Sequence, residues 1–152
     1  MTPKIVLTTT GIIMLLHGLL FFFGAEDMAR IGVPDISEKA LRMGIGLAEI
    51  VAIASVFLGI VLIFSRDIEI SSAKKVLTGT GIGFLVLIAG VIKHMIDFQN
   101  FPEQAPPIPL LIIVVLLAVW SLYVALVKKD SSTNNIKNSL KNDATGFYLS
   151  DR

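Results

Sequence analysis

Residues 43–64 read MGIGLAEIVAIASVFLGIVLIF, a run of 22 residues in which Glu49 is the only charged side chain. As an α-helix rising 1.5 Å per residue, the run is about 33 Å long, which matches a bilayer hydrocarbon core of about 30 Å. Apolar and polar residues do not alternate along it, as they would in the strands of a membrane β-barrel. The stretch therefore predicts a transmembrane α-helix.

Three further apolar runs lie at residues 5–24, 76–92 and 108–127. The second of these is short for a bilayer and reaches full length only if its helix continues through charged residues to about Phe98. We therefore expect an all-α integral membrane protein with residues 1–129 as its transmembrane domain. Residues 130–152, rich in Ser, Asn and Lys, are expected to be a disordered cytoplasmic tail. The domain is expected to be an up-and-down bundle of four transmembrane helices, at about residues 5–24, 40–65, 75–98 and 108–127.

The composition points to the same class of protein. Hydrophobic residues make up 54% of the 152 residues, charged residues 16%, and the mean hydropathy is +0.79. Soluble domains contain more charge, about 25% on average. The net charge of +1 gives no electrostatic reason to expect a nucleic-acid partner. The chain has no cysteine, which excludes disulfides, thiol catalysis and thiolate metal sites.

The lysines and arginines near the ends of the spans predict the orientation. Six of them fall on the side of the N-terminus and three on the other side, and the side with more is normally cytoplasmic. Both termini are therefore expected in the cytoplasm, with the segments around residues 25–42 and 99–107 outside. The six are Lys4, Arg66, Lys74, Lys75, Lys128 and Lys129, and the three are Arg30, Lys39 and Arg42.

Small residues form a stripe along one face of the second span and another along the third. Small side chains let two helix backbones approach closely in lipid. We therefore expect the second and third spans to pack through these faces, within one molecule or between copies. The stripe of the second span comprises Gly44, Ala48, Ala52, Ser55 and Gly59, and that of the third comprises Gly79, Gly83 and Gly90.

Six ionisable side chains fall inside the expected spans, all in the outer half of the bilayer. Such groups are costly in lipid unless they are paired or hydrated, so each is a candidate functional residue. Asp97 lies on the glycine stripe of the third span, which turns it toward the expected seam with the second span. The pattern predicts a polar pocket that opens to the outside. The six are His17 in the first span, Arg42 and Glu49 in the second, and Lys93, His94 and Asp97 in the third.

Three interpretations of this pocket remain open. In the first, the charges pair with one another and only stabilise the helices. In the second, the six residues bind or move a small ligand or protons, with Glu49 titrating and a histidine relaying protons. In the third, two histidines and two carboxylates hold a divalent metal, zinc or iron, although nearby Arg42 and Lys93 oppose a cation. The candidate metal ligands are His17, Glu49, His94 and Asp97.

These interpretations lead to three hypotheses for function. The main one is an outward-facing intramembrane pocket that binds or moves a small ligand or protons. The alternatives are a membrane-embedded metalloprotein or enzyme and an accessory subunit of a larger membrane complex. No HExxH or Ser/His/Asp pattern is present, so no catalytic residue is predicted. The expected partners are the lipid bilayer and either further copies of the chain or a larger membrane complex.

Three features of the chain occur together. The first span contains glycines, the segment Leu41-Arg42-Met43-Gly44-Ile45-Gly46-Leu47 opens the second span, and the glycine-rich third span ends near Asp97 before a proline-rich loop. In these features residues 5–127 resemble the DoxX-like proteins, small four-span membrane proteins of bacteria. The resemblance implies an up-and-down four-helix bundle in the bacterial inner membrane and no specific chemistry. Many such proteins carry an arginine at the end of the third span, where this chain has Lys93 and His94.

Overall fold

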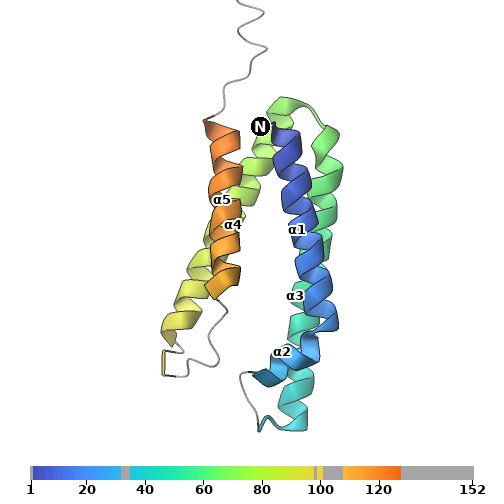
Figure 1. The fold of residues 1–152 in the computed structure, drawn as a ribbon, viewed down its shortest axis with the longest axis vertical. Helices are drawn as coiled ribbons and strands as arrows, with labels where there is room; N and C mark the ends of the chain where they lie inside the picture. The colour runs from blue at the N-terminus through green and yellow to red at the C-terminus, as the bar shows by residue number, and fades with distance from the viewer. Residues whose placement is uncertain (1, 32–34, 98, 101–107, 128–152) are drawn as a thin grey trace, which may run out of the picture.

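The computed structural model describes residues 2–31, 35–97, 99–100 and 108–127, and these residues are almost entirely helical (Figure 1). Among these described residues, four helices are long and apolar enough to cross a membrane, which confirms the predicted helical fold with four candidate spans. The tail expected at residues 130–152 lies outside the described residues. The long helices are α1 (Pro3–Phe23), α3 (Glu38–Phe64), α4 (Ile70–Asp97) and α5 (Ile108–Leu126); the short elements are α2 (Ala25–Ile31) and the 3-10 turn η1 (Ser65–Asp67).

The ends of the long helices follow from local sequence. Pro3 occupies the first turn of α1, where its missing N–H leaves no helical hydrogen bond unmade. Ser37 caps α3, since its hydroxyl oxygen accepts a hydrogen bond from the Ala40 amide at 3.3 Å. α4 continues past the apolar run at residues 76–92 to Asp97, as the length of a bilayer span requires.

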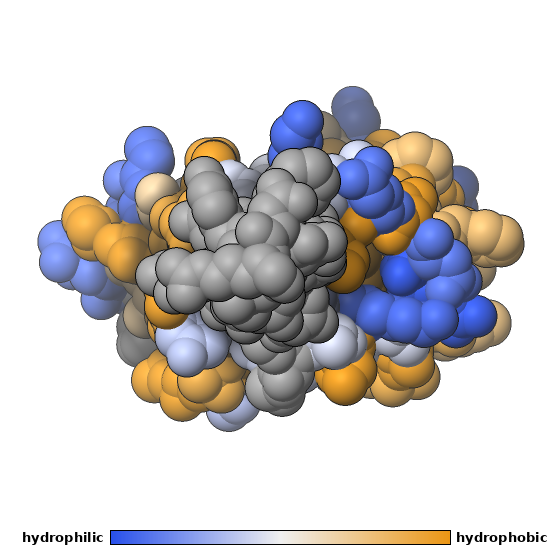
Figure 2. All heavy atoms as spheres, turned by 90° about the horizontal axis from the view of Figure 1, so that it is seen from above, coloured by the Kyte–Doolittle hydropathy of each residue, from blue (hydrophilic) through white to orange (hydrophobic). Residues whose placement is uncertain are grey.

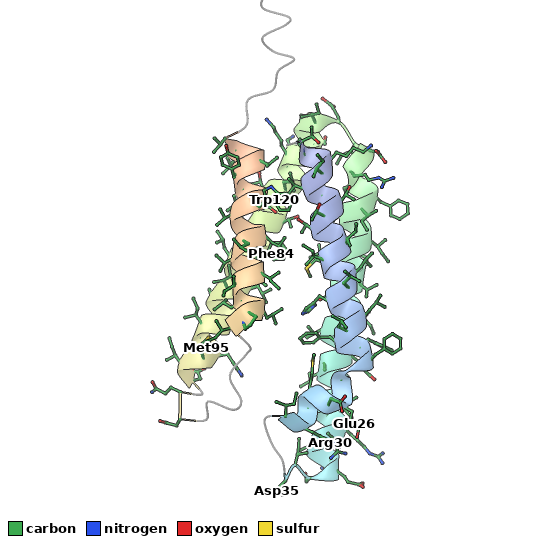
Figure 3. All side chains as sticks on the ribbon, in the orientation of Figure 1. Glu26, Arg30, Asp35, Phe84, Met95 and Trp120 are labelled. Atoms are coloured by element: carbon green, nitrogen blue, oxygen red, sulfur yellow. The ribbon has the colours of Figure 1, made fainter. Side chains whose placement is uncertain are left out.

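The short helix α2 occupies the first part of a segment that the sequence marks only as a connection. Arg30 Nη2 lies 2.9 Å from Glu26 Oε1, one helical turn away, and this ion pair supports the helix (labelled in Figure 3). α2 packs against the start of α3, where a Cβ atom added to Gly44 would lie 3.3 Å from the Ala29 Cβ. Gly44 of the predicted stripe therefore faces α2.

The four long helices form two pairs, α1 with α3 and α4 with α5 (Figure 1). In the first pair the backbones touch. A Cβ atom added to Gly18 would lie 2.6 Å from the carbonyl oxygen of Ala52, and one added to Gly59 would lie 2.7 Å from the carbonyl oxygen of Gly11. No side chain fits at either glycine, so their lack of a Cβ permits this contact.

The seam expected between the second and third spans is not formed within the chain. The small residues Ala52 and Gly59 face α1, which carries two glycines with the same spacing of seven residues. Around the three glycines of the third-span stripe the space is open, because a Cβ atom at Gly79, Gly83 or Gly90 would meet nothing within 4 Å. Within one molecule α3 therefore packs on α1 instead of α4, and the four spans form two pairs. Packing of these stripes between copies stays a prediction.

The two pairs meet at the end that holds the N-terminus and the end of α5, and they diverge toward the other end (Figure 1). A buried apolar cluster from all four long helices joins them where they meet. The η1 turn lies at the same end, where Lys4 Nζ contacts Asp67 Oδ1 at 2.6 Å. This end is therefore the closed end of the fold. The cluster is Val6, Leu7, Leu62, Ala73, Leu77, Val124 and Ala125.

The outward-facing sides of the helices are apolar. Large hydrophobic side chains are exposed on every long helix, among them Phe23, Phe64, Val86 and Leu116. Seen from above, hydrophilic and hydrophobic residues are interspersed around the end face (Figure 2). Such sides suit the hydrocarbon of a bilayer, in which the backbone groups are satisfied within the helices and apolar side chains face lipid.

We expect Leu77→Ala to lower the free energy of unfolding by about 2 kcal/mol. Leu77 is fully buried in the cluster that joins the two pairs, so alanine leaves a cavity there. Lipid is as apolar as leucine, which places the cost at the low end of the range for this substitution. Unfolding in mixed micelles measures it, with Leu85→Ala on an exposed face of α4 as the control. Equal effects of the two variants would contradict the joining role of the cluster.

Candidate functional site

A cleft of about 640 Å³ lies between the two helix pairs. All five α-helices contribute residues to its wall, and α2 contributes Met28. Phe84 of α4 (labelled in Figure 3) lines the cleft, and Ile13 and Met14 of α1 pack against the buried cluster that Phe84 forms with two residues of α5. The cleft is therefore built by the divergence of the pairs from their closed end.

Nineteen of the described residues line the cleft, and only His17 and Ser55 among these nineteen have polar side chains. His17 Nδ1 lies 3.1 Å from the Ser55 hydroxyl oxygen, in a hydrogen bond between α1 and α3. The Phe21 ring, one turn further along α1, packs on the imidazole with ring centroids 4.2 Å apart and an interplanar angle of 32°. The candidate site is therefore a single polar pair in an apolar wall.

The contact between α1 and α3 positions this pair. Gly18 follows His17 directly and brings the α1 backbone against Ala52 and Val56. Ser55 lies in the same turn of α3 and is only 7% exposed. A side chain at residue 18 would push the helices apart, so the glycine keeps the imidazole within reach of the hydroxyl.

The three ionisable residues predicted on the third span lie near the end of α4 and do not line the cleft. Lys93 Nζ donates a hydrogen bond to Asp97 Oδ2 along the helix, and both side chains are exposed. His94, on the same turn, is exposed as well. An exposed pair of this kind contributes little to stability.

The two ionisable residues predicted on the second span lie near the start of α3. Arg42 is exposed and Glu49 is half-buried, and neither lines the cleft. The structure therefore does not gather the six residues expected in one polar pocket, and His17 alone lies in the cleft. The physical reason is that α3 and α4 belong to different pairs, which diverge where these side chains lie (Figure 1).

The proposed metal ligands are not brought together. Among the residues that the structure describes, no three histidine, aspartate or glutamate side chains come close enough to hold one ion. His17 is hydrogen-bonded to a serine, and Asp97 is paired with a lysine. The geometry therefore does not support a zinc or iron site made of His17, Glu49, His94 and Asp97.

Sequence reasoning places Ser55 in a packing stripe and misses its hydrogen bond to His17. A usable signal was present, since Ser55 is the one hydroxyl among the small residues of that stripe. An intramembrane histidine needs a polar partner, and a serine on a packing face is a natural one. The third member of the site, Phe21, lies four residues after His17 and so on the same face of α1.

The chain matches no family model, no curated protein and no solved structure. The resemblance to DoxX-like proteins therefore stays a prediction.

Proposed function

We propose that this protein binds an apolar small molecule, dissolved in the membrane, in the cleft between its two helix pairs. The observation that carries the proposal is the wall, in which all lining residues except His17 and Ser55 are apolar. A volume of about 640 Å³ falls within the range of about 300–1,000 Å³ that small-molecule sites occupy. The ligand of such a site comes from lipid, unlike the ligand of the polar pocket in our main hypothesis.

The same wall argues against a path for ions or protons. A charge that crosses hydrocarbon needs polar groups or water along its route. From the part of the chain that the structure describes, the cleft receives one imidazole and one hydroxyl, which are hydrogen-bonded to each other. A single polar pair suits the recognition of one polar group on an otherwise apolar ligand.

We place the open end of the cleft in the outer leaflet of a bacterial inner membrane. The N-terminus and the end of α5 lie at the closed end (Figure 1). Basic residues of the sequence on that side outnumber those on the other side by six to three, which favours a cytoplasmic closed end. A ligand would then enter between the pairs from the outer leaflet.

Photolabelling tests this proposal. A diazirine-bearing tridecane is added to the protein in lipid nanodiscs, and the labelled residues are mapped with and without excess unlabelled tridecane. We expect saturable label on cleft residues such as Leu87 and Leu117, and unsaturable label on the lipid-facing residues Leu116 and Val119. Label that spreads evenly over cleft and lipid-facing residues, with no competition, would show that the cleft is not a binding site.

A further inference from the structure

The surroundings of the hydrogen bond between His17 and Ser55 favour one of the two imidazole tautomers. The Ser55 hydroxyl has His17 Nδ1 as its partner, and it does not bond back to its own helix as the hydroxyls of Thr8 and Ser65 do. A buried hydroxyl donor without an acceptor is costly, so the Ser55 O–H donates to Nδ1. In a neutral imidazole the other nitrogen, Nε2, then carries the hydrogen.

The Nε2–H group is consequently a donor in an apolar wall. The hydrogen bond to Ser55 involves Nδ1, and no acceptor for Nε2 is found among the described residues. The other seventeen lining residues have apolar side chains. Since a donor away from water requires an acceptor, the ligand is the natural source of one.

Two further properties of the ligand follow from the wall. None of the described residues that line the cleft is charged, so an ionised carboxylate, phosphate or amine would be removed from water without a counter-charge from them. His17 lies midway between the lining residues Ile13 and Phe21, about 6 Å along α1 from each. Apolar wall therefore extends on both sides of the donor.

We infer that the ligand is an uncharged molecule with apolar chains on both sides of a carbonyl-type oxygen, which accepts a hydrogen bond from His17 Nε2. An internal ketone or ester has this chemistry, and a free fatty acid does not. The inference rests on the proposed function, because it names the class of molecule that the cleft would bind.

Competition between two molecules that differ in one carbonyl tests the inference. Unlabelled 7-tridecanone and unlabelled tridecane are each titrated against the diazirine-bearing tridecane in nanodiscs. In the wild-type protein we expect the ketone to displace the label from the cleft at about tenfold lower concentration than the alkane, a ratio that corresponds to about 1.4 kcal/mol. Ionised tridecanoate is the third competitor and is expected to be the weakest.

Two variants test whether the tenfold advantage of the ketone over the alkane depends on the imidazole of His17. His17→Phe keeps an aromatic ring in the wall and removes the donor, so the ketone should lose its advantage while the alkane still competes. His94→Phe is the matched control, because His94 does not line the cleft and its variant should keep the tenfold ratio. Continued displacement by tridecane in His17→Phe shows that this variant is folded.

The outcomes separate the inference from the proposed function. If the ratio between the ketone and alkane concentrations that displace the label is the same in wild type and in His17→Phe, the inference is overturned and an apolar binding site remains. Tridecanoate as the strongest competitor overturns it in favour of a charged ligand. Failure of both neutral competitors to displace any label from the cleft removes the proposed function, and the inference with it.

Discussion

We expect Gly18→Leu to be destabilised by about 3 kcal/mol, near the upper end of the usual cost of overpacking. A Cβ atom at Gly18 would lie 2.6 Å from the Ala52 carbonyl oxygen and 2.9 Å from the Val56 backbone nitrogen. Backbone atoms of a helix cannot turn aside as a flexible side chain can, so α1 and α3 must separate. When the two helices separate, the hydrogen bond between His17 and Ser55 is also lost. Unfolding in mixed micelles measures the destabilisation, and loss of saturable photolabel from the cleft provides a second measurement.

Gly83→Leu is the matched control for this variant. The space around Gly83 is open, so we expect a change within about 0.5 kcal/mol, as for a surface position. Leucine is also the better helix former. A protein that tolerates leucine at Gly18 and is damaged by leucine at Gly83 would contradict the pairing described here. It would support the sequence-based alternative, in which the α4 glycines contact another copy.

The four helices are predictable because each is encoded locally. A long apolar run predicts a membrane helix wherever it occurs, and the charged end of α4 follows from the length that a bilayer requires. The pairing of helices is not encoded in this way. Periodicity shows which face of α3 is small, at Ala52 and Gly59, and does not show which helix covers that face. In the structure, Gly11 and Gly18 of α1, which have the same spacing of seven residues, lie against this face.

The candidate site, like the fold, was predictable where it depends on one helix and was not predictable where it depends on contacts between helices. The position of each ionisable group along its helix can be read from the sequence, and the structure places His17 within a helix long and apolar enough to span a membrane. Whether groups on different helices meet depends on how the helices are turned and paired. Glu49 and Asp97 were expected at one seam, and they lie on helices of different pairs. Ser55 lies beside His17 because α3 packs on α1, and the sequence did not reveal this pairing.

We expect Ala54→Trp to abolish saturable labelling of the cleft, with at least a tenfold loss of affinity, while the fold is retained. Ala54 lines the cleft one residue before Ser55, at the level where Gly18 contacts α3. An indole there would extend into open volume instead of a packed core, so the cost of overpacking is avoided. It would also obstruct the cleft beside His17, and a ligand could no longer occupy the wall on both sides of the imidazole.

Ala89→Trp separates this effect from the general addition of an indole in the membrane. Ala89 is exposed on α4 and does not line the cleft, so its variant should be labelled as the wild type is. Unchanged unfolding of Ala54→Trp together with lost labelling would place the binding site between the pairs, whereas Gly18→Leu loses labelling because the fold itself fails. If Ala54→Trp keeps saturable labelling with full affinity, the ligand does not occupy the cleft beside His17, since the indole and a bound chain would compete for the same volume.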